Sequence, residues 1–97
     1  MVFLIRDNYI IAHGTSCSDD AIVGVFRDEV ERILSSSCTA YIDDQPITST
    51  LPKTFPERVD AMADYLLRGT TVFKFRWHGR YGQVSLESVI HLQTYSI

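Results

Sequence analysis

Cys17 and His13 are the residues of this chain that could form a nucleophile and its general base, because they lie four positions apart just before a predicted helix. A thiolate is stabilised near a helix N-terminus, and an imidazole can accept the thiol proton. Two carboxylates, Asp19 and Asp20, follow directly and oppose thiolate formation. No third group is identifiable that would orient the base. We therefore predict that Cys17 is not a catalytic nucleophile and rank a small cysteine-dependent enzyme third among the functions considered.

Five side chains offer nitrogen or sulfur ligands for a metal ion: His13, Cys17, Cys38, His78 and His91. None forms a closely spaced pair such as CxxC or HxxxH, which structural zinc sites commonly use. Asp43 and Asp44 could do acid–base work as a pair, but Gln45-Pro46 follows them, which is typical of a turn. The chain also lacks a glycine-rich phosphate loop, GxSxG and HExxH. We predict no catalytic residue, no cofactor and no metal site.

A basic and aromatic segment near the C-terminus is the candidate partner-binding site. Its residues are Lys74, Arg76, His78, Arg80 and Tyr81. Such groups can neutralise phosphate and stack on bases, so nucleic-acid binding is the second function considered. However, the alternating aromatics Phe73, Phe75 and Trp77 should point to the opposite strand face, into the core. The net charge of the chain is also −3, which argues against a dedicated nucleic-acid binder. We therefore expect these residues to contact another protein, for which an acidic surface would be suitable.

Residues 70–95 predict a β-hairpin, the element around which the rest of the chain is organised. Gly79 and Gly82 bound a four-residue turn, since glycine readily adopts positive φ. This turn places Trp77 opposite Val84, Phe75 opposite Leu86, and Lys74 opposite Glu87. The predicted register matches apolar with apolar residues and a cation with an anion, as cross-strand pairs prefer.

The first 13 residues predict a second hairpin, with strands at Val2–Arg6 and Tyr9–His13 around Asp7-Asn8. Pairing about this turn sets Ile5 against Ile10 and Phe3 against Ala12 on one face. The other face then carries Leu4 against Ile11, Val2 against His13, and Arg6 against Tyr9. Both faces are partly apolar, so either both are covered or one is an interface.

Two amphipathic helices are predicted between the hairpins. Ser18 is the expected N-cap of the first, which runs to about Ser35 with a buried stripe of Ile22, Phe26, Val30, Ile33 and Leu34. Thr54 and Glu57 form a capping box for the second, which turns Val59, Met62, Ala63 and Leu66 inward and ends near Gly69. Cys38–Ile42 predicts a strand, and residues 47–51 predict either a strand or an irregular connection.

These elements predict a single α+β domain over residues 1–97, in the order β-β-α-β-(β)-α-β-β. An antiparallel sheet of four to six strands should have both helices on one face. The predicted core is Phe3, Ile5, Ile10, Phe26, Val30, Ile33, Val59, Met62, Leu66, Phe73, Phe75, Trp77, Val84 and Leu86. The opposite face should form a homodimer interface through Val2, Leu4, Tyr9, Ile11, Val89 and Tyr95.

Composition bounds the class of protein. Hydrophobic residues make up 45% and charged residues 22% of the chain, which is ordinary for a folded domain. No apolar run approaches the roughly 20 residues that span a bilayer, so no membrane partner is expected. The N-terminal segment lacks a basic start and predicts strands rather than a signal peptide. With two cysteines expected to be free thiols, we predict a cytoplasmic location. The leading function is a small non-enzymatic binding module, a regulator or inhibitor acting by surface complementarity.

Overall fold

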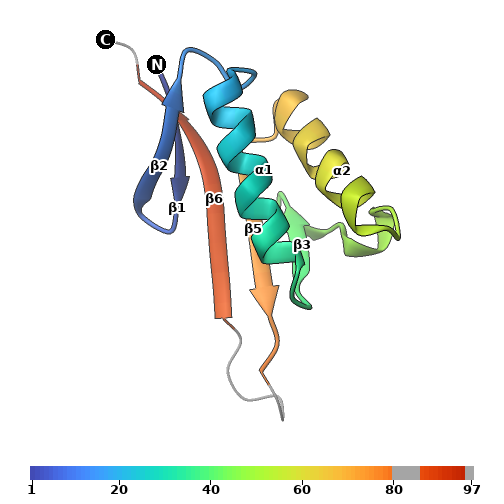
Figure 1. Cartoon of the computed structure of the whole chain (residues 1–97). Coiled ribbons are helices and arrows are strands. Elements are labelled where there is room, and N and C mark those ends of the chain that lie inside the picture. Colours follow the sequence, from blue (N-terminus) through green and yellow to red (C-terminus); the bar gives the residue numbers. More distant parts are fainter. Residues whose placement is uncertain (80–85, 96–97) are drawn as a thin grey trace.

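The computed structural model describes residues 1–79 and 86–95 as one six-stranded antiparallel sheet with two helices (Figure 1). The elements are β1 Val2–Arg6, β2 Tyr9–Gly14, α1 Asp20–Leu34, β3 Thr39–Ile42, β4 Gln45–Pro46, the 3-10 turn η1 Thr48–Thr50, α2 Phe55–Leu67, β5 Val72–Trp77 and β6 Leu86–Thr94. The strand order is β2-β1-β6-β5-β3-β4. The predicted α+β class and order of elements are confirmed. The optional strand is shifted, because Gln45–Pro46 pairs with β3 and residues 48–50 form η1.

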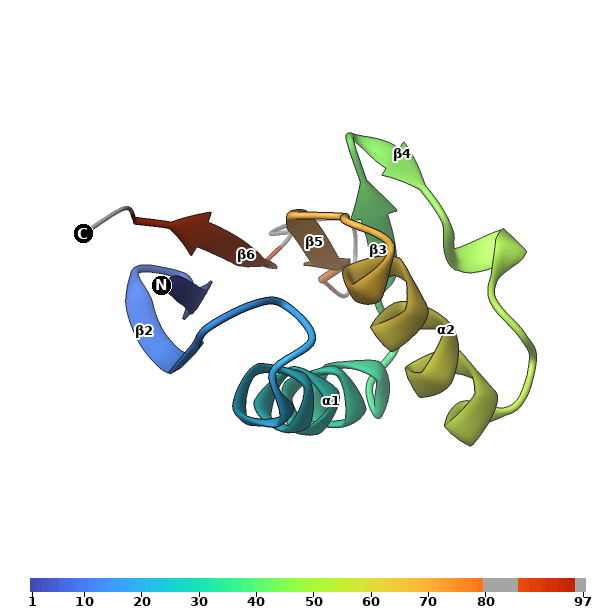
Figure 2. The same cartoon turned by 90° about the horizontal axis from the view of Figure 1, so that it is seen from above.

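Both helices lie on the same side of the sheet, as predicted (Figure 2). The sheet turns Leu4, Phe73, Phe75 and Ile90 toward them. Fully buried helix residues complete this core: Ile22, Phe26, Val30, Val59, Met62 and Leu66. The 3.6-residue spacing of apolar positions on each helix explains this, since it places them on one stripe. The other side of the sheet, which neither α1 nor α2 covers, is called the outer face below.

Asp19, rather than the predicted Ser18, caps the N-terminus of α1. Its carboxylate accepts hydrogen bonds from the backbone N–H of Ala21 at 3.0 Å and of Thr15 at 3.1 Å. Gly14 permits this arrangement, because a Cβ at that position would come within 2.8 Å of the Asp19 side chain. The predicted inward stripe of α1 is confirmed for Ile22, Phe26, Val30 and Ile33, while Leu34 is half-buried.

The capping box predicted for α2 is absent. Thr54 occupies the N-cap position with an extended backbone, but its side chain makes no capping hydrogen bond. An N-cap side chain bonds to the N–H of the second or third helical residue. Pro56, the second, has no N–H to offer, and the N–H of Glu57, the third, does not bond to the Thr54 side chain. At the other end the prediction holds, because Gly69 adopts a φ of 109° and Thr70 N–H donates to Tyr65 at 3.0 Å.

The first hairpin turns at Asp7 and Asn8, both with positive φ, as predicted. Ile5 pairs with Ile10 and Arg6 with Tyr9, again as predicted. Beyond these pairs a β-bulge shifts the register by one residue. The pairs there are Leu4 with Ala12, Phe3 with His13, and Val2 with Gly14. Ile11 is the extra residue, and it packs against the core.

The assignment of faces on this hairpin is corrected by the structure. Leu4 is 0% exposed and lies in the core, whereas Ile10 is 60% exposed. Pairing explains this, because Leu4 lies opposite Leu92 and Arg6 opposite Ile90, on the helix side of β6. Four residues predicted for the dimer interface are therefore misplaced: Val2, Leu4 and Tyr9 are on the helix side, and Ile11 packs against the core. Three predicted core residues are likewise on the outer face: Phe3, Ile5 and Ile10. Of these, Ile5 is nevertheless buried, as predicted, at 8% exposure.

The second hairpin has its faces as predicted but a different register. Trp77 pairs with Leu86 and Phe75 with Ser88, a shift of two positions from the prediction. A shift by an even number preserves the alternation, so Phe73 and Phe75 stay buried. Leu86 is 66% exposed, so its predicted core position is wrong. Trp77 is half-buried and packs against the core. Most of the predicted turn, like Val84, lies outside the described residues.

Candidate functional site

The outer face has an apolar half over β2, β1 and β6. Cross-strand pairing aligns Ile10, Ile5, His91 and Val72 in one row across four strands. Phe3 lies beside this row, and the ring of Tyr95 packs edge-on against it at 5.2 Å between centroids. Ile10, Val72 and Tyr95 are all exposed, although they are large apolar side chains. Contiguous apolar groups of this kind usually mark a contact surface.

The remaining part of the outer face, over β5 and β3, carries ion pairs. Lys74 lies 3.4 Å from Asp44, and Arg76 donates to Glu87 and sits over the Tyr41 ring at 5.7 Å. The hydrogen bond from Arg76 holds the pKa of Glu87 below its ordinary value. Two of the predicted partner-binding cations thus already have acidic partners within the fold.

Of the other predicted partner-binding residues, the structure describes only His78. His78 follows β5 and is exposed, while Arg80 and Tyr81 lie outside the described residues. Of the predicted dimer interface, Val89 lies on the outer face opposite Lys74, and Tyr95 packs on Phe3. The outer face therefore keeps two residues of the predicted interface and adds Phe3, Ile5, Ile10 and Val72, which were assigned elsewhere or not at all.

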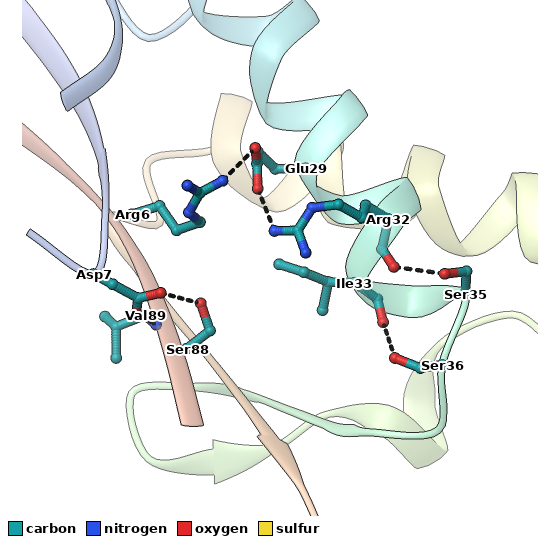
Figure 3. Close-up of polar contacts among 9 residues, drawn as sticks. All are labelled: Arg6, Asp7, Glu29, Arg32, Ile33, Ser35, Ser36, Ser88 and Val89. Atoms are coloured by element: carbon teal, nitrogen blue, oxygen red, sulfur yellow. Dashed lines mark hydrogen bonds and ion pairs between the residues drawn. The ribbon is translucent and has the colours of Figure 1, made fainter. Parts of the chain in front are cut away.

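On the helix side, a cleft of about 630 Å³ opens beneath the C-terminal half of α1. We call it the α1 cleft. It is lined by Arg6, Asp7, Arg32, Trp77, Leu86, Glu87 and Ser88. Figure 3 shows Arg6 and Arg32 approaching Glu29 from two sides, with Asp7 and Ser88 across the opening. Residues distant in sequence meet here only through the fold.

Glu29 joins the two arginines of the cleft. Its Oε1 accepts from Arg6 Nη1 and its Oε2 from Arg32 Nη2, each at 2.7 Å. Burial of this carboxylate raises its pKa, but the hydrogen bonds and charges of Arg32 and Arg6 outweigh burial and hold the pKa of Glu29 below its ordinary value. The same contact raises the pKa of Arg6. Arg32 thus pairs with Glu29, three residues before it on the same helix.

The opposite wall of the cleft is fixed by Asp7. Its Oδ1 accepts from Val89 N–H and its Oδ2 from the buried Ser88 hydroxyl, both at 2.9 Å. The adjacent Trp77 Nε1–H donates to Ser36 Oγ at 2.7 Å, which fixes the indole against the end of α1. The cleft therefore has polar walls with defined geometry and an apolar floor.

The sequence patterns did not predict this cleft. One signal was available: Arg6 follows Val2 and Leu4 at the two-residue spacing of a strand, so a cation shares the face of apolar residues. Such a residue needs an acidic partner from a covering element. The sequence does not indicate which acidic residue of the first helix pairs with Arg6, because that depends on how the helix lies on the sheet.

Replacement of Glu29 should remove stability in a pH-dependent way. Because its folded-state pKa is lowered, its contribution is present above its unfolded-state pKa and is lost as pH falls through the folded value. We expect Glu29→Gln to cost about 1–3 kcal/mol at pH 7, since two charge-assisted hydrogen bonds weaken. The cost should shrink when unfolding is measured in acid. Glu31→Gln, an exposed change on the same helix, is the control and should have little effect at either pH.

The surroundings of the two cysteines bear on the third-ranked function, a cysteine-dependent enzyme. Cys17 and Cys38 are both free and half-buried, and burial raises the pKa of Cys38. Asp19 lies two residues after Cys17. Its carboxylate accepts hydrogen bonds from the backbone of Ala21 and Thr15, and these hydrogen bonds lower the pKa of Asp19. Cys17 instead lines a small hollow beside Leu66 and Leu92. Within residues 1–79 and 86–95, no group of three potential metal ligands comes together.

Comparisons with protein-family models, with curated proteins and with solved structures found no match for this chain. Neither helix in the described part of the chain has the length and apolar character needed to cross a membrane.

Proposed function

We propose that this chain is a small non-enzymatic protein-binding module, a regulator or inhibitor that acts by surface complementarity through its outer face. The observation that carries the proposal is the row of Ile10, Ile5, His91 and Val72 on the sheet face away from α1 and α2, because the large apolar side chains of Ile10 and Val72 are exposed in it. Its natural setting would be the cytoplasm, where two free thiols remain reduced.

The first partner we propose for the outer face is a second copy of the chain, in a two-fold homodimer. The face carries an apolar half beside a half with both charge signs, in the pairs Lys74–Asp44 and Arg76–Glu87. In a two-fold interface the same patch meets itself, so a surface with both signs can be self-complementary. A strongly one-signed surface would instead repel its copy.

The pairing of Lys74 and Arg76 within the fold also bears on the nucleic-acid alternative. Cations that already bond to Asp44 and Glu87 offer less positive potential to phosphate groups. Protein binding therefore remains the first choice for this surface, with another protein as the partner if the copies do not associate.

The homodimer is tested by charging the apolar row. We expect the wild-type chain to show a dimer mass in light scattering at high micromolar concentration, and Ile10→Lys combined with Val72→Lys to give a folded monomer. Leu67→Lys is a matched control, because Leu67 is an exposed leucine on α2, away from this face. A monomeric wild type, or a double variant that still dimerises, would contradict the proposal.

A further inference from the structure

We propose that the α1 cleft is a second binding site, for an apolar carboxylate. In this site the ligand's carboxylate bonds to Arg6 and Arg32, and its aromatic or branched aliphatic body lies on Trp77 and Leu86. The cleft is on the helix side of the sheet, so this inference does not depend on the outer face.

The two guanidinium groups have donors to spare. Each carries five N–H groups in a planar fork, which suits carboxylate geometry. Within the described residues, Arg6 and Arg32 each use one of these nitrogens to bond to Glu29. Because a single carboxylate holds both forks, their positions are set before any ligand arrives, and less side-chain entropy is lost on binding.

The acids near the cleft are already engaged. Both oxygens of Asp7 accept hydrogen bonds from Ser88 and Val89, and Glu87 is held by Arg76. The charge of Asp7 still repels an anion, so it would orient the ligand. The ligand's carboxylate would turn toward α1 and the arginines, and the ligand's apolar part would turn toward the end of the sheet.

The floor of the cleft is apolar and accessible. Leu86 is 66% exposed and lies directly opposite Trp77 on the neighbouring strand. Trp77 is half-buried, and its bond to Ser36 fixes the ring. Leu86 and the fixed indole of Trp77 can contact the apolar body of a ligand. The two arginines beside them can bond to its carboxylate. The volume of about 630 Å³ lies in the range of small-molecule sites.

Trp77 makes the test direct, because it is the only tryptophan in the chain. Titration with 3-phenylpropanoate should give a saturable change in Trp77 fluorescence, and the neutral 3-phenylpropanamide should bind at least tenfold more weakly. Arg32→Gln should weaken binding of the acid about tenfold without unfolding the chain, since its side chain is 59% exposed. Arg27→Gln is the matched control: this arginine lies on the same helix but pairs with Asp60. Leu86→Ser should weaken the acid and the amide alike.

Two further arms identify the source of the carboxylate. Gly-Gly-Phe with a free C-terminus would bind more tightly than 3-phenylpropanoate if the site takes the end of a peptide chain, and more weakly if it takes a small free acid. Either result supports the site, provided that the C-terminal amide of the peptide fails to bind. Equal binding of acid and amide, an unchanged affinity in Arg32→Gln, or no saturable signal up to tens of millimolar would overturn the proposal.

Discussion

Leu4→Lys should unfold the protein. Leu4 lies on β1 and its side chain is completely buried in the core, so the lysine charge would have to enter the core without a partner. Loss of a buried leucine typically costs about 2–5 kcal/mol. An unpaired buried charge adds several more. Together these approach the roughly 5–15 kcal/mol that stabilises a domain of this kind. Circular dichroism should show loss of secondary structure at 25 °C.

The neighbouring variant Ile10→Lys provides the contrast. Ile10 belongs to the same hairpin but lies on the outer face and is mostly exposed. It should therefore remain folded, with a melting midpoint near that of the wild type when both are measured at a concentration at which the wild type is monomeric. A folded Leu4→Lys variant would show that the two faces of this hairpin are assigned the wrong way round.

Phe75→Ala should cost about 3–5 kcal/mol, the usual range for truncating a buried phenylalanine. Phe75 is fully buried at the centre of β5, between β3 and β6. Trp77, two residues further along the same face, is half-buried at the end of the strand. We expect Trp77→Ala to cost clearly less, about 1–3 kcal/mol, because less apolar surface is lost from the core.

Urea unfolding followed by circular dichroism compares the two variants without relying on tryptophan fluorescence. If Trp77→Ala were as costly as Phe75→Ala, the indole would be a core residue, as alternation alone predicts. The α1 cleft would then lose its apolar floor.

The two proposed binding surfaces face opposite sides of the sheet, which has a functional consequence. The outer face and the α1 cleft share β1, β5 and β6 but use alternate residues of these strands, except for Glu87, which pairs with Arg76 and also lines the cleft. A protein on one surface would not obstruct a carboxylate on the other. Both could be occupied together, so each can be tested by variants that leave the other surface intact.

Local interactions determined the parts of this fold that the sequence predicts well. The inward stripes of α1 and α2 follow from the 3.6-residue helical period, and Val59, Met62, Ala63 and Leu66 are buried as that period requires. The tight turn at Asp7 and Asn8 follows from side chains that tolerate positive φ. Alternation correctly assigned Phe73 and Phe75 to one face of β5. Each of these features depends on residues close together in the chain.

Only the tertiary structure decided the rest. Both faces of β1 are apolar, so alternation could not tell whether Leu4 or Ile5 meets the helices; pairing of β1 with β6 makes that choice. The bulge at Ile11 and the two-residue shift between β5 and β6 are likewise set by packing against neighbouring strands and helices. The Arg6–Glu29–Arg32 network forms because the fold brings Glu29 of α1 within 2.7 Å of Arg6 on β1. These features join residues that are far apart in sequence, and no local pattern records which distant residues will meet.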